Sequence, residues 1–376
     1  MRKGLAIITI LILMIAAGCG NQEQLNEDKV NVLTSFYPLY DMVSQIGGEH
    51  VHAINMIPAG VDPHDWTYKS QDIVQMTKAQ LFIYNGAGFD DWWVDEMLHS
   101  LGNDQPPIVV ASEGISLIEA DANHEDEAEH AHDEAEHAHD EAEHAHDEAQ
   151  HAHDEAEHSH DEAEHERDEE EHAHDEEEHA HDEEEHAHDE AEHAHGDGHH
   201  HGNVDPHVWL SPVNAIQLAS NIKEGLISVD PEHEADYEAN YEVLKGKLER
   251  LHEEYETVVR EAPRREFVTS HQAFAYLARD YGLTQLSVMG LTTEAEPTSQ
   301  DMKTISKFIE EHGVRYMLFE ELASPEIAKT LAKDLGIQML PFHPIEGLTK
   351  QQEADGKDYL SLMRENLNSL KLALQG

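Results

Sequence analysis

Residues 232–260 read EHEADYEANYEVLKGKLERLHEEYETVVR and predict a single long helix. The segment begins after Asp230-Pro231 and ends before Pro263, and proline interrupts helices. Apolar residues recur at spacings of four and three and form one stripe of Tyr237, Tyr241, Leu244, Leu248, Leu251, Tyr255 and Val258. Such a stripe could pair two copies of the chain, but packing against the chain's own lobes is the simpler interpretation. We therefore expect a monomer.

Short β-rich runs alternate with helical runs on both sides of this helix. The expected strands are Val30–Phe36, Val51–Ile57, Leu81–Tyr84, Ile108–Val110, Glu266–Thr269, Leu286–Val288, Val314–Phe319 and Ile337–Leu340. The expected helices run from after Pro38 to about Ile46 and over Gln71–Lys78, Asp90–Ser100, Gln272–Tyr281, Asp301–His312, Pro325–Leu335 and Tyr359–Leu374. This alternation implies mostly parallel sheets flanked by helices. We predict an α/β fold of two lobes, residues 30–230 and 263–376, joined by one rigid helix within residues 231–262, with a cleft between the lobes.

The phrase D-P-H-x-W occurs twice, as Asp62-Pro63-His64-Asp65-Trp66 and as Asp205-Pro206-His207-Val208-Trp209. Proline fixes its own φ and disfavours a helical conformation for the preceding residue, so each phrase is a stiff loop that presents one imidazole. The tryptophan can cover such a site with apolar surface. Two rigidly held imidazoles indicate metal ligation. The two aspartates either orient the imidazoles as hydrogen-bond acceptors or simply begin the turns, and both interpretations stay open.

Further candidate ligands follow the expected strands, where open α/β sheets bind ligands. His64 follows the second expected strand by a short loop, His271 directly follows the fifth, and Glu346 follows the eighth. With His207, they make a set of three imidazoles and one carboxylate, which suits zinc. Because such ligands must be deprotonated, binding should weaken as the pH falls toward the ordinary histidine pKa of about 6.5.

Glu346 is the ligand with the most alternatives. Water, His343, Glu320 or Glu321 could take the fourth position, because these residues lie in or near comparable strand ends. The remaining histidines outside the repeats have no such context and are interpreted as surface residues: His50, His52, His99, His233, His252 and His312.

The first 18 residues are predicted to be a signal peptide. Arg2 and Lys3 precede an apolar run, Leu5–Ala17, that is too short to span a bilayer comfortably, and small residues precede Cys19. The junction resembles a bacterial lipobox, in which cleavage leaves Cys19 as the acylated first residue. Cys19 is the only cysteine, so no disulfide can form within the chain. We expect an exported protein anchored by lipid on Cys19 to the extracellular face of the cell membrane, with residues 19–29 as a polar tether.

A histidine-rich tract, residues 124–201, holds 23 of the 33 histidines. Its unit H-A-H-D-E-A-E repeats every seven residues from His130, with no apolar residue larger than alanine. We expect the tract to be disordered, because it cannot bury enough surface to offset the entropy of ordering. Imidazoles beside carboxylates bind zinc, copper or nickel weakly at many sites, which favours a metal-collecting role. Repeat slippage with no selected role is the alternative.

The formal net charge of −57 is unevenly distributed. The tract holds 35 Asp or Glu against one Arg, which accounts for −34 and leaves −23 for the remainder. An acidic remainder argues against a nucleic-acid partner and for a cationic ligand.

Together these motifs resemble the zinc-binding members of the metal-specific solute-binding proteins of ABC importers, the ZnuA/AdcA type. The resemblance spans Val30 to Gly376 and rests on the lipobox Cys19, on 62–64 (DPH), on the acidic His-rich insertion, and on 205–212 (DPHVWLSP), 270–274 (SHQAF) and 342–347 (FHPIEG). It implies two α/β lobes, zinc bound in the cleft as cargo, and delivery to a membrane permease subunit.

The resemblance also implies the ligand set. His64, His207 and His271 match the family's histidine ligands, and Glu346 stands at the place of its final acidic ligand. Manganese-binding relatives usually have a carboxylate as the third ligand, so His271 favours zinc over manganese.

Three other functions suit parts of the sequence. One is a manganese-binding importer component, and another is a surface zinc buffer or adhesin in which the tract is the working part. A secreted zinc hydrolase would need an open coordination position and a general base, commonly on a helix with H-E-x-x-H. That motif does not occur in the sequence, so we predict that the chain is not an enzyme.

Overall fold

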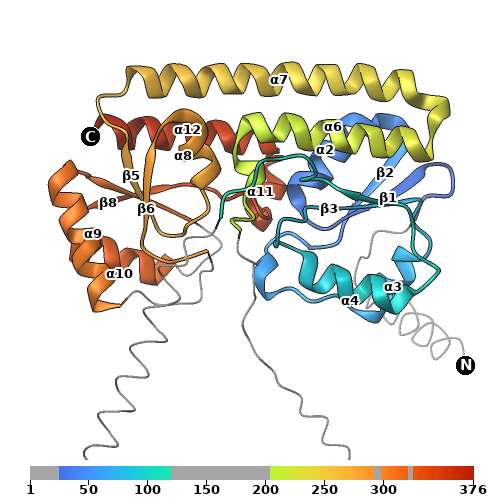
Figure 1. Ribbon diagram of the computed structural model, residues 1–376, viewed down its shortest axis with the longest axis horizontal. Helices are drawn as coiled ribbons and strands as arrows, with labels where there is room; N and C mark the ends of the chain where they lie inside the picture. Colours follow the sequence, from blue (N-terminus) through green and yellow to red (C-terminus); the bar gives the residue numbers. More distant parts are fainter. Residues whose placement is uncertain (1–24, 120–203, 292–297, 321–324) are drawn as a thin grey trace, which may run out of the picture. The chain divides into compact units, whose positions relative to one another are not determined.

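The computed structural model describes residues 25–119, 204–291, 298–320 and 325–376 (Figure 1). The predicted signal peptide, Cys19, the part of the tether before residue 25, Glu321 and the histidine-rich tract lie outside the described residues. The described residues contain two four-stranded sheets, and every strand pair in them is parallel. The predicted α/β class with two parallel sheets is thus confirmed.

The first sheet has the strand order β2-β1-β3-β4. Its strands are β1 (Val30–Thr34), β2 (Val51–Asn55), β3 (Leu81–Tyr84) and β4 (Ile108–Val110). The helices are α2 (Tyr37–Gly47), α3 (Ser70–Met76), α4 (Asp91–Leu101) and α6 (Pro212–Val229). Figure 1 shows α2 and α6 on one face of the sheet and α3 and α4 on the other. Strand β1, in the interior of this sheet, is buried on both sides, as expected for a parallel sheet covered by helices.

The second sheet repeats this plan in the order β6-β5-β7-β8. Its strands are β5 (Glu266–Thr269), β6 (Thr284–Ser287), β7 (Tyr316–Phe319) and β8 (Gln338–Pro341). The helices are α8 (Ala275–Tyr281), α9 (Ser299–His312), α10 (Pro325–Leu335), the short α11 (Lys350–Ala354) and α12 (Tyr359–Gln375). In the first sheet the connection after β1 leads to β2 on one side and the connection after β3 leads to β4 on the other, and β5 and β7 behave in the same way in the second sheet. Each sheet therefore has one topological switch point, between β1 and β3 and between β5 and β7.

Helix α7 (Glu234–Glu261) packs on helices of both halves of the chain. It contacts α2 and α6 above the first sheet and α12 and α8 above the second (Figure 1). The predicted stripe is buried along its length except at the end, where Val259 is buried and Val258 is only half-buried. Six turns of a helix with 3.6 residues per turn advance about 22 residues, which leads from Tyr237 to Val259. The expectation for Val258 was therefore wrong by one residue.

Helices α6 and α11 were missed by the sequence analysis. The sequence at the start of α6 is typical of a helix N-terminus, because serine precedes a proline there. In the structure the Ser211 side chain caps the helix by accepting a hydrogen bond from the Asn214 backbone N–H, and Pro212 is the first helical residue. Its buried residues recur at spacings of three and four: Ala215, Leu218, Ala219, Ile222 and Leu226. Most other boundaries agree with the predicted elements to within one to three residues.

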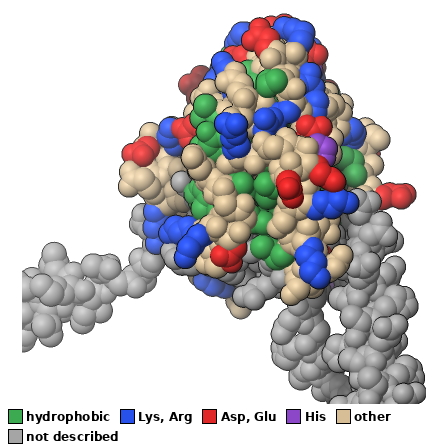
Figure 2. Space-filling view, turned by 90° about the vertical axis from the view of Figure 1, so that its left-hand side faces the viewer, with side chains coloured by type: hydrophobic (Ala, Val, Ile, Leu, Met, Phe, Trp, Pro, Cys, Tyr) green, Lys and Arg blue, Asp and Glu red, His purple; other side chains and the backbone are tan. Residues whose placement is uncertain are grey.

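Charges of both signs occur on the surface. Figure 2 shows Lys and Arg side chains interspersed with Asp and Glu on the face near α9 and α10, so the acidic excess of the sequence does not form one continuous acidic surface there. None of the helices in the part of the chain that the structure describes is both long and apolar enough to cross a bilayer.

Candidate metal centre

The second sheet presents polar residues at its switch point. His271 follows β5 after Ser270, and Glu320 directly follows β7. At the first sheet, Asn85 follows β3, and its side-chain amide donates a hydrogen bond of 3.2 Å to the carbonyl oxygen of Pro206. The second D-P-H phrase is therefore fastened to the switch point of the first sheet, where ligands of open α/β folds bind.

The structure brings the four residues of the predicted set together. Ligand atoms of His64, His207, His271 and Glu346 all lie within 4.8 Å of one another. Their exposed fractions are 7%, 0%, 2% and 1%, respectively. Buried charged and polar groups are rare unless they are paired or coordinate a metal, so this cluster is the strongest candidate site among the described residues.

Asp205 fixes the orientation of His207. Its Oδ1 atom accepts hydrogen bonds from Nδ1 of the imidazole at 2.8 Å and from the backbone N–H of His207 at 2.9 Å. A proton on Nδ1 leaves Nε2 as the metal donor, as in carboxylate–histidine–zinc arrangements. In the first phrase, Oδ1 of Asp62 accepts from the backbone N–H of His64 at 3.0 Å, a contact that begins the turn.

The tryptophans of the two phrases have different neighbours. Trp209 is fully buried, with its ring centroid 5.3 Å from that of His207, so it covers the site as expected. Trp66 instead packs edge-on against Trp93 in the first lobe, at 5.0 Å.

Glu346 is positioned by an unusual turn. The preceding residue, Ile345, has φ of 56°, a left-handed conformation that is uncommon for a β-branched side chain and costs about 1–3 kcal/mol. The indole N–H of Trp209 holds this turn by donating a 2.7 Å hydrogen bond to the carbonyl oxygen of Pro344. The carboxylate then lies between two imidazoles, with Oε2 3.3 Å from Nε2 of His64 and Oε1 3.3 Å from Nε2 of His207.

The imidazole of His271 has a hydrogen-bond acceptor at each nitrogen. Nδ1 lies 3.1 Å from Oε2 of Glu320, and Nε2 lies 2.9 Å from the carbonyl oxygen of Leu291. The ring centroid is 5.0 Å from that of His207 and 6.1 Å from that of His64. A metal ion bound at Nε2 would take the place of the Leu291 contact.

The site couples buried acids and bases. Burial alone would lower the pKa of His207, but the carboxylates of Asp205 and Glu346 outweigh burial and raise that pKa to about 9. Burial likewise opposes protonation of His64, whose pKa is nevertheless raised by Glu346. Burial would raise the pKa of Glu346, but the three imidazoles, His64 first, hold it well below its usual range.

A divalent cation suits this donor set. Nε2 of His207 and Oε1 of Glu346 are buried, face each other at 3.3 Å and lack hydrogen-bond geometry. One ion between them would satisfy both atoms. Three imidazole nitrogens and one carboxylate oxygen match the tetrahedral preference of zinc.

Comparison with known proteins places the chain in a family. A family model described as ZnuA, zinc-uptake complex component A periplasmic, matches residues 32–373. The chain belongs to the ZnuA family. The high-affinity zinc uptake system protein ZnuA of Bacillus subtilis is 32% identical over 377 residues, covering 99% of this chain and 97% of that protein.

Two further ZnuA-family comparisons involve Streptococcus pneumoniae. Its zinc-binding lipoprotein AdcA is 28% identical over 371 residues, which cover 99% of this chain but only 61% of AdcA. The crystal structure of the Zn(II)-bound ZnuA-like domain of that protein matches with a TM-score of 0.64 and 26% identity, and the match covers 93% of this chain and 100% of the domain. The two-lobe ZnuA fold is thus the fold of this chain.

The alternatives for the fourth position have other partners. Glu320 contacts His271 and does not belong to the group of four. His343 is held by α12, because its backbone N–H donates to Oδ1 of Asn366 at 2.7 Å and its Nε2 lies 3.6 Å from Glu365. Among these candidates, Glu346 is therefore the carboxylate that lies at metal-ligand spacing from all three imidazoles.

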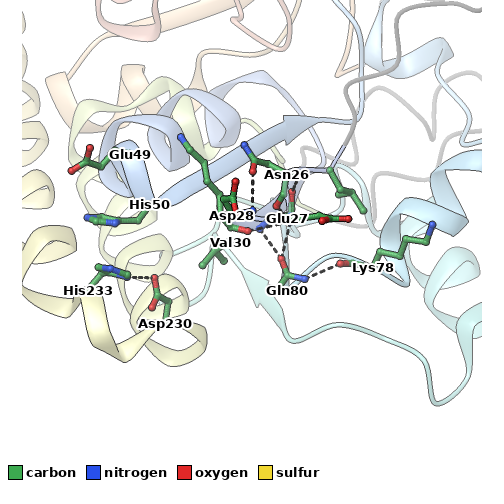
Figure 3. A pocket seen from close by; sticks show the side chains of 13 residues that line it. Asn26, Glu27, Asp28, Val30, Glu49, His50, Lys78, Gln80, Asp230 and His233 are labelled. Atoms are coloured by element: carbon green, nitrogen blue, oxygen red, sulfur yellow. Dashed lines mark hydrogen bonds and ion pairs between the residues drawn. The ribbon is translucent and has the colours of Figure 1, made fainter.

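A second histidine cluster, away from this site, was missed by the sequence analysis. His50 and His233, interpreted as isolated surface residues, stack with ring centroids 3.8 Å apart beside a polar pocket (Figure 3). Each has its own carboxylate: Nε2 of His50 lies 3.1 Å from Asp236, and Nδ1 of His233 lies 2.7 Å from Asp230. The pair joins the end of α2 to the start of α7. In the described ranges, groups of three or more His, Cys, Asp or Glu side chains with metal-ligand spacing are limited to the set of His64, His207, His271 and Glu346.

The pKa of His207 predicts how metal binding depends on pH. A folded-state pKa of about 9 against 6.5 when unfolded means that the metal-free protein carries this proton at neutral pH. Zinc must displace it, so the apparent zinc affinity should fall about tenfold per pH unit below about 9 for each proton displaced. The pH dependence of zinc binding thus extends above the ordinary histidine range that we expected from the sequence, because two carboxylates face the imidazole of His207.

The same proton stabilises the metal-free fold below about pH 6.5, and this contribution is lost as the pH rises through about 9. Chelator competition at pH 6.5, 7.5 and 8.5 measures the affinity, and urea unfolding of the metal-free protein over the same range measures the stability. A zinc affinity that is constant between pH 6.5 and 8.5 would contradict the prediction.

Proposed function

We propose that the protein is the extracytoplasmic zinc-binding component of an ABC importer, which captures Zn²⁺ and delivers it to a membrane permease. The observation that carries the proposal is the buried set of His64, His207, His271 and Glu346 as ligands of one ion. The segments that follow β2, β5 and β8 supply His64, His271 and Glu346, and the loop that precedes α6 supplies His207. Membership of the ZnuA family, with relatives named for zinc uptake and zinc binding, supports zinc as the cargo.

The donor set supports transport rather than catalysis. A catalytic zinc site typically has three protein ligands and keeps one position open for water, whereas four protein donors close the coordination sphere. All four donors here come from the protein. We therefore propose that the chain is not an enzyme.

The proposed chain organisation follows the sequence. It comprises a signal peptide (1–18), lipidated Cys19 with a tether to residue 29, lobes over 30–230 and 263–376, and a linking helix within 231–262. The name of the pneumococcal relative, a lipoprotein, supports a lipid anchor on the outer face of the membrane. In this arrangement a monomer binds zinc outside the cell and passes it to the permease.

Deleting residues 124–201 tests the function. Glu119 and Val204 form an antiparallel bridge, and the Asp205 backbone N–H donates to the Ile118 carbonyl at 2.9 Å, so the described residues on either side of the deleted region already pair with each other. We expect tight one-to-one zinc binding to survive, because all four ligands lie outside the tract, while additional weak sites disappear. Isothermal titration before and after deletion measures both classes of site.

The outcomes separate the candidate functions. Loss of the tight site with the tract would support a surface zinc buffer or adhesin instead. Competitive titration of the shortened protein with Mn²⁺ decides the cargo, and three imidazoles should favour zinc because nitrogen donors suit Zn²⁺ better than Mn²⁺. Tighter binding of Mn²⁺ than of Zn²⁺ would overturn the assignment of cargo.

A further inference from the structure

Glu320 is a buried carboxylate that the proposed ligand set does not use. Its exposed fraction is 6%, and it directly follows β7 at the switch point of the second sheet. Its backbone N–H donates to Oγ of Ser270 at 3.3 Å, while the Ser270 backbone N–H donates to the Leu318 carbonyl at 2.9 Å. Glu320 is thus tied to the residue that precedes His271.

The side chain of Glu320 reaches the same imidazole. Its Oε2 atom lies 3.1 Å from Nδ1 of His271, and both groups are almost completely buried. The backbone of His271 is held separately, because its carbonyl oxygen accepts a 2.7 Å hydrogen bond from Oγ1 of Thr269. The contact with Glu320 therefore restricts rotation of the His271 side chain rather than movement of its backbone.

The first lobe contains a similar arrangement. Asp205 accepts from Nδ1 of His207 at 2.8 Å and leaves Nε2 to face Glu346. A carboxylate on the non-coordinating nitrogen fixes the tautomer, orients the ring and raises the basicity of the donor nitrogen. The two carboxylates come from unrelated sequence contexts, since Asp205 lies within a D-P-H phrase and Glu320 follows strand β7.

We propose that Glu320 is the positioning residue for His271 in zinc binding. Its carboxylate accepts a hydrogen bond from the Nδ1–H group of His271 and so presents Nε2 to the ion, which replaces the Leu291 carbonyl as the partner of Nε2. This role rests on the proposed function, because it assumes that His271 is a zinc ligand. Glu320 itself is not proposed as a ligand, because it lies outside the group with metal-ligand spacing and its Oε2 atom is engaged with His271.

Zinc affinity of full-length variants tests the role. A chelator of high affinity reports only the tight site, so weak sites in the histidine tract do not contribute. Glu320→Ala should weaken zinc binding about 10–100-fold, the usual cost of losing such a partner. Glu320→Gln keeps the shape and an acceptor oxygen, so it should lose less, about tenfold. Glu256→Ala is the matched control, because Glu256 pairs with His252 on the surface at 3.6 Å and should leave the affinity unchanged.

A double-mutant cycle separates positioning from a general structural effect. If Glu320 acts through His271, then Glu320→Ala should cause no further loss of affinity in a His271→Ala background but its full loss in a His207→Ala background. Equal losses in both backgrounds, or an affinity of Glu320→Ala within twofold of wild type, would overturn the proposal. Unfolding midpoints of the metal-free variants identify any that fail to fold, and Glu320→Gln then carries the test. Absence of tight zinc binding in the wild-type protein would instead defeat the proposed function.

Discussion

Replacing His207 with alanine should weaken zinc binding at least about a hundredfold. Structural zinc sites with four protein ligands bind with about 10–16 kcal/mol, so each ligand contributes roughly 2.5–4 kcal/mol. His207 is fully buried and its ring is already oriented by Asp205, so little ordering entropy offsets its contribution. Competition with a chromophoric chelator at a fixed pH measures the change.

Exposed His99 on α4 provides the control for this experiment. His99→Ala removes an exposed imidazole that does not belong to the group of four predicted ligands, so the tight affinity should stay within twofold of wild type. Glu346→Gln should resemble His207→Ala in the size of its effect, because it removes the negative charge that lies 3.3 Å from Nε2 of both His64 and His207. A His207→Ala protein that is folded and retains wild-type affinity would exclude this histidine as a ligand.

Trp209→Ala should lower the free energy of unfolding by about 3–5 kcal/mol, the usual cost of removing a fully buried large aromatic side chain. Trp209 is fully buried and packs against Phe36 and Phe89, with ring centroids 4.7 Å and 4.9 Å away. Its backbone carbonyl also accepts a 2.6 Å hydrogen bond from the hydroxyl of Tyr359 in α12. Urea unfolding of the metal-free protein, monitored by two independent probes, measures the loss.

Trp209→Phe distinguishes packing from hydrogen bonding. Phenylalanine keeps most of the apolar surface but leaves the Pro344 carbonyl without its indole partner, so we expect a smaller loss of about 1–3 kcal/mol. Zinc affinity should fall in both variants, because that hydrogen bond holds the turn that positions Glu346. Partly exposed Trp92 on α4 is the control, and its replacement by alanine should cost less than Trp209→Ala. A stability loss below about 1 kcal/mol for Trp209→Ala would contradict the packing argument.

Periodicity and turn chemistry predicted most of the architecture. Strand β3 and helix α10 have the predicted bounds, and the long helix differs by two residues at its start and one at its end. These signals are local, because the spacing of apolar residues and the position of proline act within a few residues of chain. Helix α6 was missed although Ser211 and Pro212 marked its start.

The composition of the candidate site was also predictable, but its surroundings were not. His64, His207 and His271 were chosen because they follow prolines or strand ends, and parallel strands bring their carboxyl ends to one edge. No local sequence pattern indicated which residues would contact the imidazole of His271. Glu320 was considered only as an alternative ligand, and its contact with Nδ1 joins residues 49 positions apart. The stacking of His50 on His233 is a long-range contact of the same kind.

Local sequence was thus sufficient for the α/β class, the linking helix and the residue types of the site, since each depends on the preferences of neighbouring residues. The direction of the side chains required the folded chain. His343 and Glu346 are three residues apart, yet one is held by α12 and the other faces two imidazoles. The left-handed conformation of Ile345 separates them, and a hydrogen bond from Trp209, 135 positions away, holds the turn next to it. A strained backbone persists only where such long-range packing stabilises it.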